Sequence, residues 1–162
     1  MSEPKTADLA AARPISGQLA VCAFLEKQAL WKGLKREDLE LLFRAGRVLR
    51  CAAGEVILRE GEPGDLLFQV YSGAVRVLGK GPRGPLELAR LQRGALFGEV
   101  GFLAGRPRTA SVVAAEPSEV LCFGRPELEP LLAANPKVRK LMETMMAARA
   151  QDTIAKALAG RD

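Results

Sequence analysis

The spacing of apolar residues divides the chain into three parts with different periodicities. The first and last parts carry apolar residues at intervals of three and four, which is typical of amphipathic helices. The middle part alternates apolar and polar residues in short runs that glycines separate. We therefore predict an N-terminal tail and helices over residues 1–46, a β-rich region over 47–124 and C-terminal helices over 125–162.

The N-terminal part predicts two helices after a tail. The first 14 residues are rich in alanine and polar side chains, and we expect them to be poorly ordered. Residues 15–31 fit a helix, and residues 35–46 fit a shorter one with acidic residues in its first turn and a glycine at its end. The apolar face predicted for the first helix consists of Leu19, Cys22, Ala23 and Leu30.

The C-terminal part predicts one long helix. Asn135-Pro136 is a helix start signal, because asparagine caps helices and proline is favoured in the first turn. The helix is expected to reach Leu158 and to end before Gly160. Its predicted apolar stripe consists of Val138, Leu141, Met142 and Met145.

Composition removes several classes of function. The chain has 162 residues, a net charge of +5 and no histidine, which excludes Ser-His-Asp and Cys-His catalysis and histidine-ligated metal sites. The three cysteines are far apart and contain no CxxC pair, so we expect free thiols in a reducing, cytoplasmic compartment. An uncharged run of 12 residues over 14–25 is too short to span a membrane.

Charge distribution argues against nucleic-acid binding. The basic excess is spread along the chain rather than gathered in one stripe, and aromatic residues are 5% of the chain. Two residues follow Gly160, so we expect no DNA-reading helix-turn-helix in this chain.

One segment carries recognisable chemistry, FGEVGFLAGRPRTASV over residues 97–112. The turn beginning at Gly98 can point backbone N–H groups outward, and Arg108 presents a planar fork suited to phosphate oxygens. Glu99 can accept hydrogen bonds from a sugar hydroxyl. A ligand with one phosphate and a nearby ribose hydroxyl matches this set, whereas the alternative is a polar turn with a Glu–Arg salt bridge.

This segment resembles the phosphate-binding cassette of the cyclic nucleotide-binding domain family. The family pattern is F-G-E, then apolar and small residues, then R-[TSA]-A and an apolar strand. Further likeness lies upstream, in residues 54–57, 60–62, 64–65, 68–70 and 73–77, and the resemblance covers roughly residues 30–150. It implies a fold that is mainly β with flanking helices, an antiparallel β-roll like that of catabolite activator proteins.

The resemblance also implies roles for single residues. Glu99 would bind the ribose 2′-hydroxyl, and Arg108 would pair with the cyclic phosphate. The backbones of Gly98 and Ala110 would donate N–H groups, and Val100 would line the apolar side. No catalytic residue, metal or further cofactor is implied beyond the ligand, cAMP or cGMP.

Two more residues bear on ligand choice and on the switch. Thr109 would lie beside the phosphate and the base. Similar family members that bind cAMP also carry threonine or serine there, so the residue permits both nucleotides, and we expect cAMP to be preferred over cGMP. Thr153, on the C-terminal helix, would lie near the adenine amino group. That helix is expected either to cover the nucleotide as a lid or to form a homodimer, and the sequence favours the dimer slightly.

The expected function is therefore a non-enzymatic, cyclic nucleotide-binding regulatory module that signals to an unidentified effector protein through its C-terminal helix. Enzymatic hydrolysis is disfavoured because the segment offers no second convergent carboxylate and no metal ligands. The alternative is a scaffold or dimerisation protein with a vestigial nucleotide site.

Overall fold

Two antiparallel sheets face each other and enclose part of the core in the computed structural model, which describes residues 5–98, 102–103 and 105–159, with side chains up to 149. One sheet has the order β1-β2-β9-β4-β7 and the other β3-β8-β5-β6. The strands are β1 (Arg13–Pro14), β2 (Arg47–Cys51), β3 (Val56–Leu58), β4 (Leu66–Ser72), β5 (Val75–Gly81), β6 (Gly84–Leu91), β7 (Leu96–Phe97), β8 (Ser111–Ala114) and β9 (Ser118–Gly124). The predicted antiparallel β-roll with flanking helices is confirmed.

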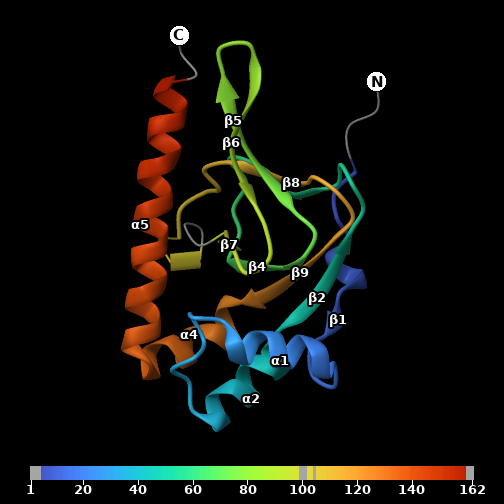
Figure 1. Ribbon diagram of the computed structural model, residues 1–162, viewed down its shortest axis with the longest axis vertical. Coiled ribbons are helices and arrows are strands. Elements are labelled where there is room, and N and C mark those ends of the chain that lie inside the picture. Colours follow the sequence, from blue (N-terminus) through green and yellow to red (C-terminus); the bar gives the residue numbers. More distant parts are fainter. Residues whose placement is uncertain (1–4, 99–101, 104, 160–162) are drawn as a thin grey trace.

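Helices cover one end of the sheets, and one long helix runs beside them (Figure 1). The hairpin of β5 and β6 projects beyond the opposite end. The helices are η1 (Leu9–Ala11, a 3-10 turn), α1 (Leu19–Lys27), α2 (Arg36–Ala45), α4 (Arg125–Ala134) and α5 (Pro136–Ala159). The long helix α5 follows α4 directly and runs alongside the β-roll, and the tip of the β5–β6 hairpin lies beyond its end (Figure 1).

The buried apolar residues form two clusters. One fills the space between the sheets and includes Phe68, Val75 and Phe97, while the other joins the helices to the outer side of the five-stranded sheet. In the second cluster the buried Trp31 donates its indole N–H to Oε1 of Gln69 on β4 at 2.9 Å. This bond pairs two buried polar groups and fixes the turn after α1 against β4.

The N-terminal segment corrects the prediction of a poorly ordered tail. Its backbone bonds to β3 on both sides of Val56, whose N–H donates to the Lys5 carbonyl and whose carbonyl accepts from Ala7, each at 2.8 Å. Ala7 is buried in the cluster between the sheets, and β1 adds to the edge of β2. Backbone pairing stabilises this segment, and its small polar side chains gave no sign of that.

The predicted helices at the N-terminus are found, but the face of the first differs. α1 begins at Leu19, which is 84% exposed, and Ala23 is exposed too, whereas Cys22 and Leu30 pack in the helical cluster as predicted. The helix also buries Val21, Phe24 and Leu25. The predicted face assumed a helix through residue 31, whereas Leu30 and Trp31 lie in the turn that follows α1. The second predicted helix is confirmed as α2, with its acidic first turn and Gly46 at its end.

The long C-terminal helix is confirmed, and its inner face is narrower than predicted. Val138 and Met142 are buried and Met145 packs against the helical cluster, but Leu141 is 38% exposed. Asn135 was expected to cap the helix with its side chain. Its carbonyl accepts the N–H of Val138, while its side-chain amide donates to Asp38 on α2 and to the Leu131 carbonyl. The residue therefore ties the α4–α5 corner to α2.

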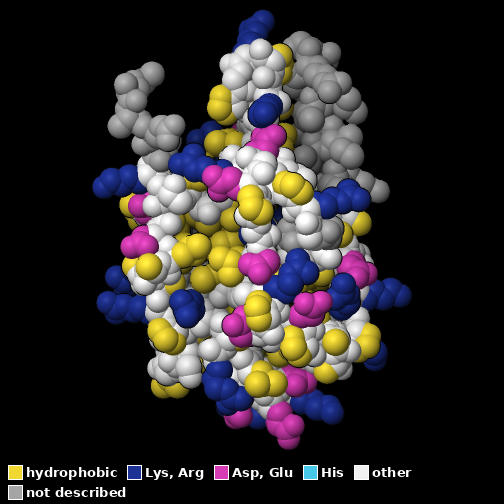
Figure 2. Space-filling model, turned by 180° about the vertical axis from the view of Figure 1, so that it is seen from behind, with side chains coloured by type: hydrophobic (Ala, Val, Ile, Leu, Met, Phe, Trp, Pro, Cys, Tyr) yellow, Lys and Arg dark blue, Asp and Glu magenta, His cyan; other side chains and the backbone are white. Residues whose placement is uncertain are grey.

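Two sequence expectations about the surface and the thiols can be compared with the structure. In the view from behind, basic and acidic side chains are interspersed over the described surface (Figure 2). Cys22, Cys51 and Cys122 are free thiols, as predicted. Among the described residues, none of the helices combines the length and apolar character that crossing a membrane requires.

Candidate functional site

The segment singled out in the sequence leaves the end of β7, the edge strand of the five-stranded sheet, and enters β8, an inner strand of the four-stranded sheet. Gly98 follows β7 directly, and its carbonyl accepts the N–H of Phe102 at 3.2 Å. Phe102 is 3% exposed and belongs to the helical cluster. The segment is thus anchored to the strand on one side and to the helices on the other.

Arg108 is the buried charged residue at the centre of this site. It is 6% exposed, and its guanidinium donates from Nη1 to the Gly98 carbonyl at 2.8 Å and from Nη2 to the Leu66 carbonyl at 3.0 Å. Burying a guanidinium is costly unless its N–H groups are satisfied. The two carbonyls come from β4 and from the end of β7, so the sheet sets the orientation of the guanidinium.

The backbone of Arg108 is held as firmly as its side chain. Its N–H donates to the Glu62 carbonyl at 2.9 Å, and its carbonyl accepts from Gly61 at 2.8 Å. Next to these bonds, the N–H of Glu60 donates to Oγ of Ser111 at 3.0 Å. The β3–β4 loop therefore lines up with the segment that carries the arginine, and this pairing preorganises the site.

Two glycines make room for the guanidinium. A Cβ on Gly64 would lie 2.7–3.0 Å from Nη2, Nε and Cζ of Arg108, closer than side chains tolerate. Gly98 has a φ of +81°, and a Cβ there would lie 2.9 Å from the Leu66 carbonyl oxygen and 3.1 Å from Nη1 of Arg108. Glycine is needed at Gly98 because of its positive φ and the backbone carbonyl beside it, whereas a side chain at Gly64 would displace the guanidinium of Arg108.

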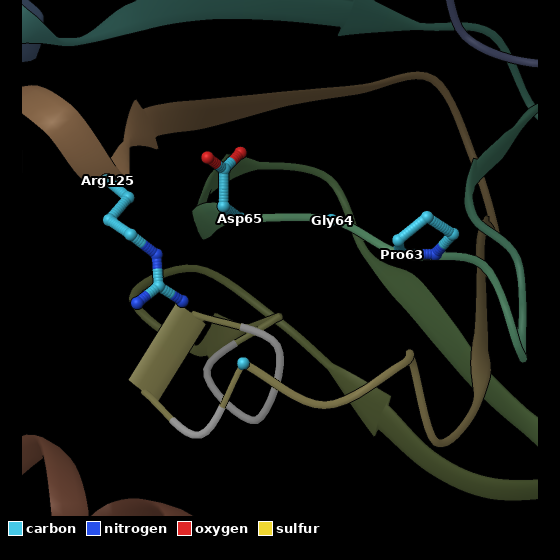
Figure 3. A pocket seen from close by; sticks show the side chains of 5 residues that line it. Pro63, Gly64, Asp65 and Arg125 are labelled. Atoms are coloured by element: carbon cyan, nitrogen blue, oxygen red, sulfur yellow. The ribbon is translucent and has the colours of Figure 1, made fainter.

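An open pocket of about 480 Å³ lies between the β3–β4 loop and the start of α4 (Figure 3), and Gly64, which packs against Arg108, is part of its lining. This size falls within the range of small-molecule sites, about 300–1,000 Å³. Its described lining consists of Pro63, Gly64, Asp65, Gly105 and Arg125.

Charges at the pocket come from both sides. Asp65 lines the pocket from the β3–β4 loop and Arg125 from the first residue of α4, and their charged groups point in different directions (Figure 3). Arg125 also lies over the ring of Phe102, with Cζ 5.3 Å from its centroid. The described lining thus carries one charge of each sign, and the buried guanidinium of Arg108 packs against Gly64, which is part of that lining.

The structure brings some of the predicted site residues together. Gly98 and Arg108 are hydrogen-bonded, Thr109 is exposed beside the arginine, and Ala110 is half-buried against the cluster between the sheets. Glu99 and Val100 lie outside the described residues. Thr153 lies within α5, and its side chain is also outside the described part.

Sequence reasoning missed two partners of Arg108 as members of the site. Gly64 was noticed as part of a motif but not as the surface on which the guanidinium rests. The Leu66 carbonyl carries no side-chain signal at all, because it is a backbone group of β4. Both belong to the loop and strand that precede Arg108 by more than 40 residues.

The comparisons with known proteins agree with this geometry. The family model of the cyclic nucleotide-binding domain matches residues 48–135. A cAMP-dependent protein kinase regulatory subunit from Aspergillus fumigatus is 36% identical over 110 residues, which are 68% of this chain and 26% of the relative. The chain thus matches about a quarter of the length of this curated relative.

Solved structures show the same fold. A cyclic nucleotide-binding domain from Methylobacillus flagellatus superposes with a TM-score of 0.71 at 26% identity, covering 92% of this chain and 86% of that one. The regulatory domain of Toxoplasma gondii PKA, crystallised with cAMP, gives a TM-score of 0.71 at 26% identity, covering 78% and 48%. The family match includes Arg108 and the two glycines, Gly64 and Gly98, that make room for it. Because the match spans more than half of the sequence, this chain belongs to the cyclic nucleotide-binding domain family.

Proposed function

We propose that this chain binds a cyclic nucleotide, cAMP in preference to cGMP, and that it acts as a regulatory module whose C-terminal helix carries the signal. The observation that carries the proposal is the buried guanidinium of Arg108, oriented by the carbonyls of Gly98 and Leu66. A guanidinium fixed in this way matches the oxygens of a cyclic phosphate, and a fixed group loses little entropy when the ligand arrives.

The remaining ligand contacts are proposed from the family pattern. Glu99 binds the ribose 2′-hydroxyl, Val100 lines the apolar side, and the N–H groups of Gly98 and Ala110 complete the phosphate site. The preference for cAMP is supported by the relatives, which include the cAMP-dependent kinase subunit and the regulatory domain crystallised with cAMP. Thr109 is exposed next to Arg108, so its hydroxyl is available to either nucleotide.

The helix α5 is proposed as a lid over the nucleotide. Its inner residues Val138, Met142 and Met145 pack on this chain's own core, which supports an intramolecular role. The sequence slightly favoured a dimer through the same helix, and in that case Thr153 would approach the adenine at the dimer seam. Light scattering at micromolar concentration separates the two, because a lid leaves a mass near 17.4 kDa.

Thermal unfolding with added nucleotide tests the proposal. Because a ligand stabilises only the folded state, cAMP at 100 times its dissociation constant should raise the free energy of unfolding by about 2.7 kcal/mol. Noncyclic 5′-AMP is the matched control, since it carries the same base and ribose with a different phosphate. The absence of any shift with cAMP and cGMP would favour the alternative of a scaffold with a vestigial site.

A further inference from the structure

Arg149 on α5 reaches back to the edge of the β-roll. It is half-buried, and its Nη1 donates a hydrogen bond to the carbonyl oxygen of Leu96, the first residue of β7. The contact lies about three helical turns beyond Val138, which is the first buried residue of α5. Arg149 thus lies one turn beyond Met145, the last described residue of α5 that packs against the helical cluster.

The carbonyl that Arg149 binds belongs to an edge strand. β7 is the last strand of the five-stranded sheet and pairs on one side with β4, through Phe68 and Gln69. None of the described strands pairs with its other side, and Leu96 itself is 1% exposed. A buried carbonyl needs a donor, and the guanidinium of Arg149 supplies one.

Leu96, whose carbonyl accepts the hydrogen bond from Arg149, lies two positions before Gly98. Phe97 lies between them, is 2% exposed, and stacks on Phe68 with ring centroids 4.9 Å apart. The carbonyl of Gly98 accepts the hydrogen bond from Arg108. Residues 96–98 are therefore held by two hydrogen bonds, one from Arg149 to the carbonyl of Leu96 and one from Arg108 to the carbonyl of Gly98.

We propose that Arg149 is a positioning residue that couples the docking of α5 to the orientation of Arg108. With α5 docked, β7 is fixed and the Gly98 carbonyl holds the guanidinium in place; with α5 released, that end of β7 loosens. This inference rests on the proposed nucleotide function of Arg108. Coupling of this kind is reciprocal, so that ligand on Arg108 favours docked α5 by the same factor that docked α5 favours ligand.

Hydrogen exchange of single amides in the ligand-free protein tests the structural half of the coupling. The variants are Arg149→Met and Arg149→Lys, with Arg139→Met as the control, because Arg139 is on the same helix and pairs with Glu143 at the surface. Arg149→Met should raise exchange at least fivefold over residues 146–158. It should also raise exchange at the amides of Phe102 and Val70, which bond to Gly98 and Ala95.

Calorimetric titration with cAMP tests the functional half. Arg149→Met should weaken binding about fivefold, Arg149→Lys should recover part of the loss by restoring one donor, and Arg139→Met should bind like the parent. Unchanged exchange at Phe102 and Val70 in Arg149→Met overturns the proposal. Weaker binding without any change of exchange also overturns it, because Arg149 would then contact the ligand directly.

The two proposals fail in different ways. If the parent protein binds no cyclic nucleotide, the proposed function is wrong. The exchange of Phe102 and Val70 in the free protein still decides whether α5 holds the end of β7 through Arg149.

Discussion

Nη1 of Arg108 donates to the carbonyl of Gly98 at 2.8 Å, which joins the two ends of the segment that carries the site chemistry. The arginine comes ten residues after the glycine, and the bond closes the segment over the edge of the sheet. Because Gly98 has a φ of +81°, its backbone turns in a way that a side chain would strain. The position of the phosphate-binding group thus depends on one glycine conformation and on the strand before it.

Replacing Gly64 with alanine should disturb ligand binding more than folding. The added Cβ would meet the Arg108 guanidinium at 2.7–3.0 Å, so the guanidinium must shift to make room for it. We expect cAMP affinity to fall about tenfold, or about 1.4 kcal/mol, in calorimetry. Gly33→Ala is the matched control, because a Cβ there meets no atom within 4 Å. Parent-like affinity in Gly64→Ala would show that the guanidinium does not need its place on Gly64.

Replacing Ala7 with glutamate should destabilise the fold. The side chain of Ala7 is 7% exposed between the sheets, so a carboxylate there either loses its hydration or pulls the segment off β3. We expect a loss of about 2 kcal/mol and a midpoint lower by about 4–8 °C in thermal unfolding. Ala10→Glu is the control, since Ala10 is exposed on the same segment. Equal midpoints for the two variants would mean that residues 5–8 do not pack as described.

The buried thiols should make the folded state less stable at alkaline pH. Burial raises the pKa of Cys51 from 9.0 to about 12 and that of Cys122 to about 11. Below pH 9 both thiols are protonated in the folded and unfolded chain alike. Above pH 9 the unfolded chain loses these protons first, so stability falls as pH rises toward 11–12, by up to about 1.4 kcal/mol per pH unit for each thiol.

Urea unfolding between pH 8.5 and 10.5 measures this effect. Other groups also titrate in this range, so the comparison is with Cys51→Ala, in which the slope of stability against pH should be shallower by roughly one proton. The same slope in both proteins would show that Cys51 ionises equally in the folded and unfolded chain.

Local sequence signals predicted some elements well and others poorly. α2 was predictable because its acidic first turn, apolar stripe and terminal glycine all lie within a dozen residues. The inner face of α1 was not, because Leu19 stands at the first turn, where the helix faces solvent. The packing of residues 5–14 depends on backbone bonds to β3 and β2, which leave no trace in the side-chain pattern.

The site, too, contains residues that the sequence predicted and residues that it did not. Arg108 was identifiable because its motif is contiguous and its chemistry is specific to anions. The residues that position Arg108 were not identifiable, because Leu66 contacts it through a backbone carbonyl and Gly64 leaves room for it by lacking a side chain. Arg149 gave no signal either, since the apolar stripe of α5 ends before it and the strand it binds is 53 residues away.

Calorimetric titration of cAMP into Arg108→Ala, beside the parent and Arg106→Ala, tests the central claim most directly. Arg106 is exposed two residues before Arg108 and should bind like the parent when replaced. Because Arg108 is buried, Arg108→Lys and a thermal midpoint for each variant establish that the fold is retained. Loss of the charged partner should cost about 2–5 kcal/mol, a fall in affinity of at least about thirtyfold. Folded Arg108→Ala that binds cAMP as tightly as the parent would contradict the account.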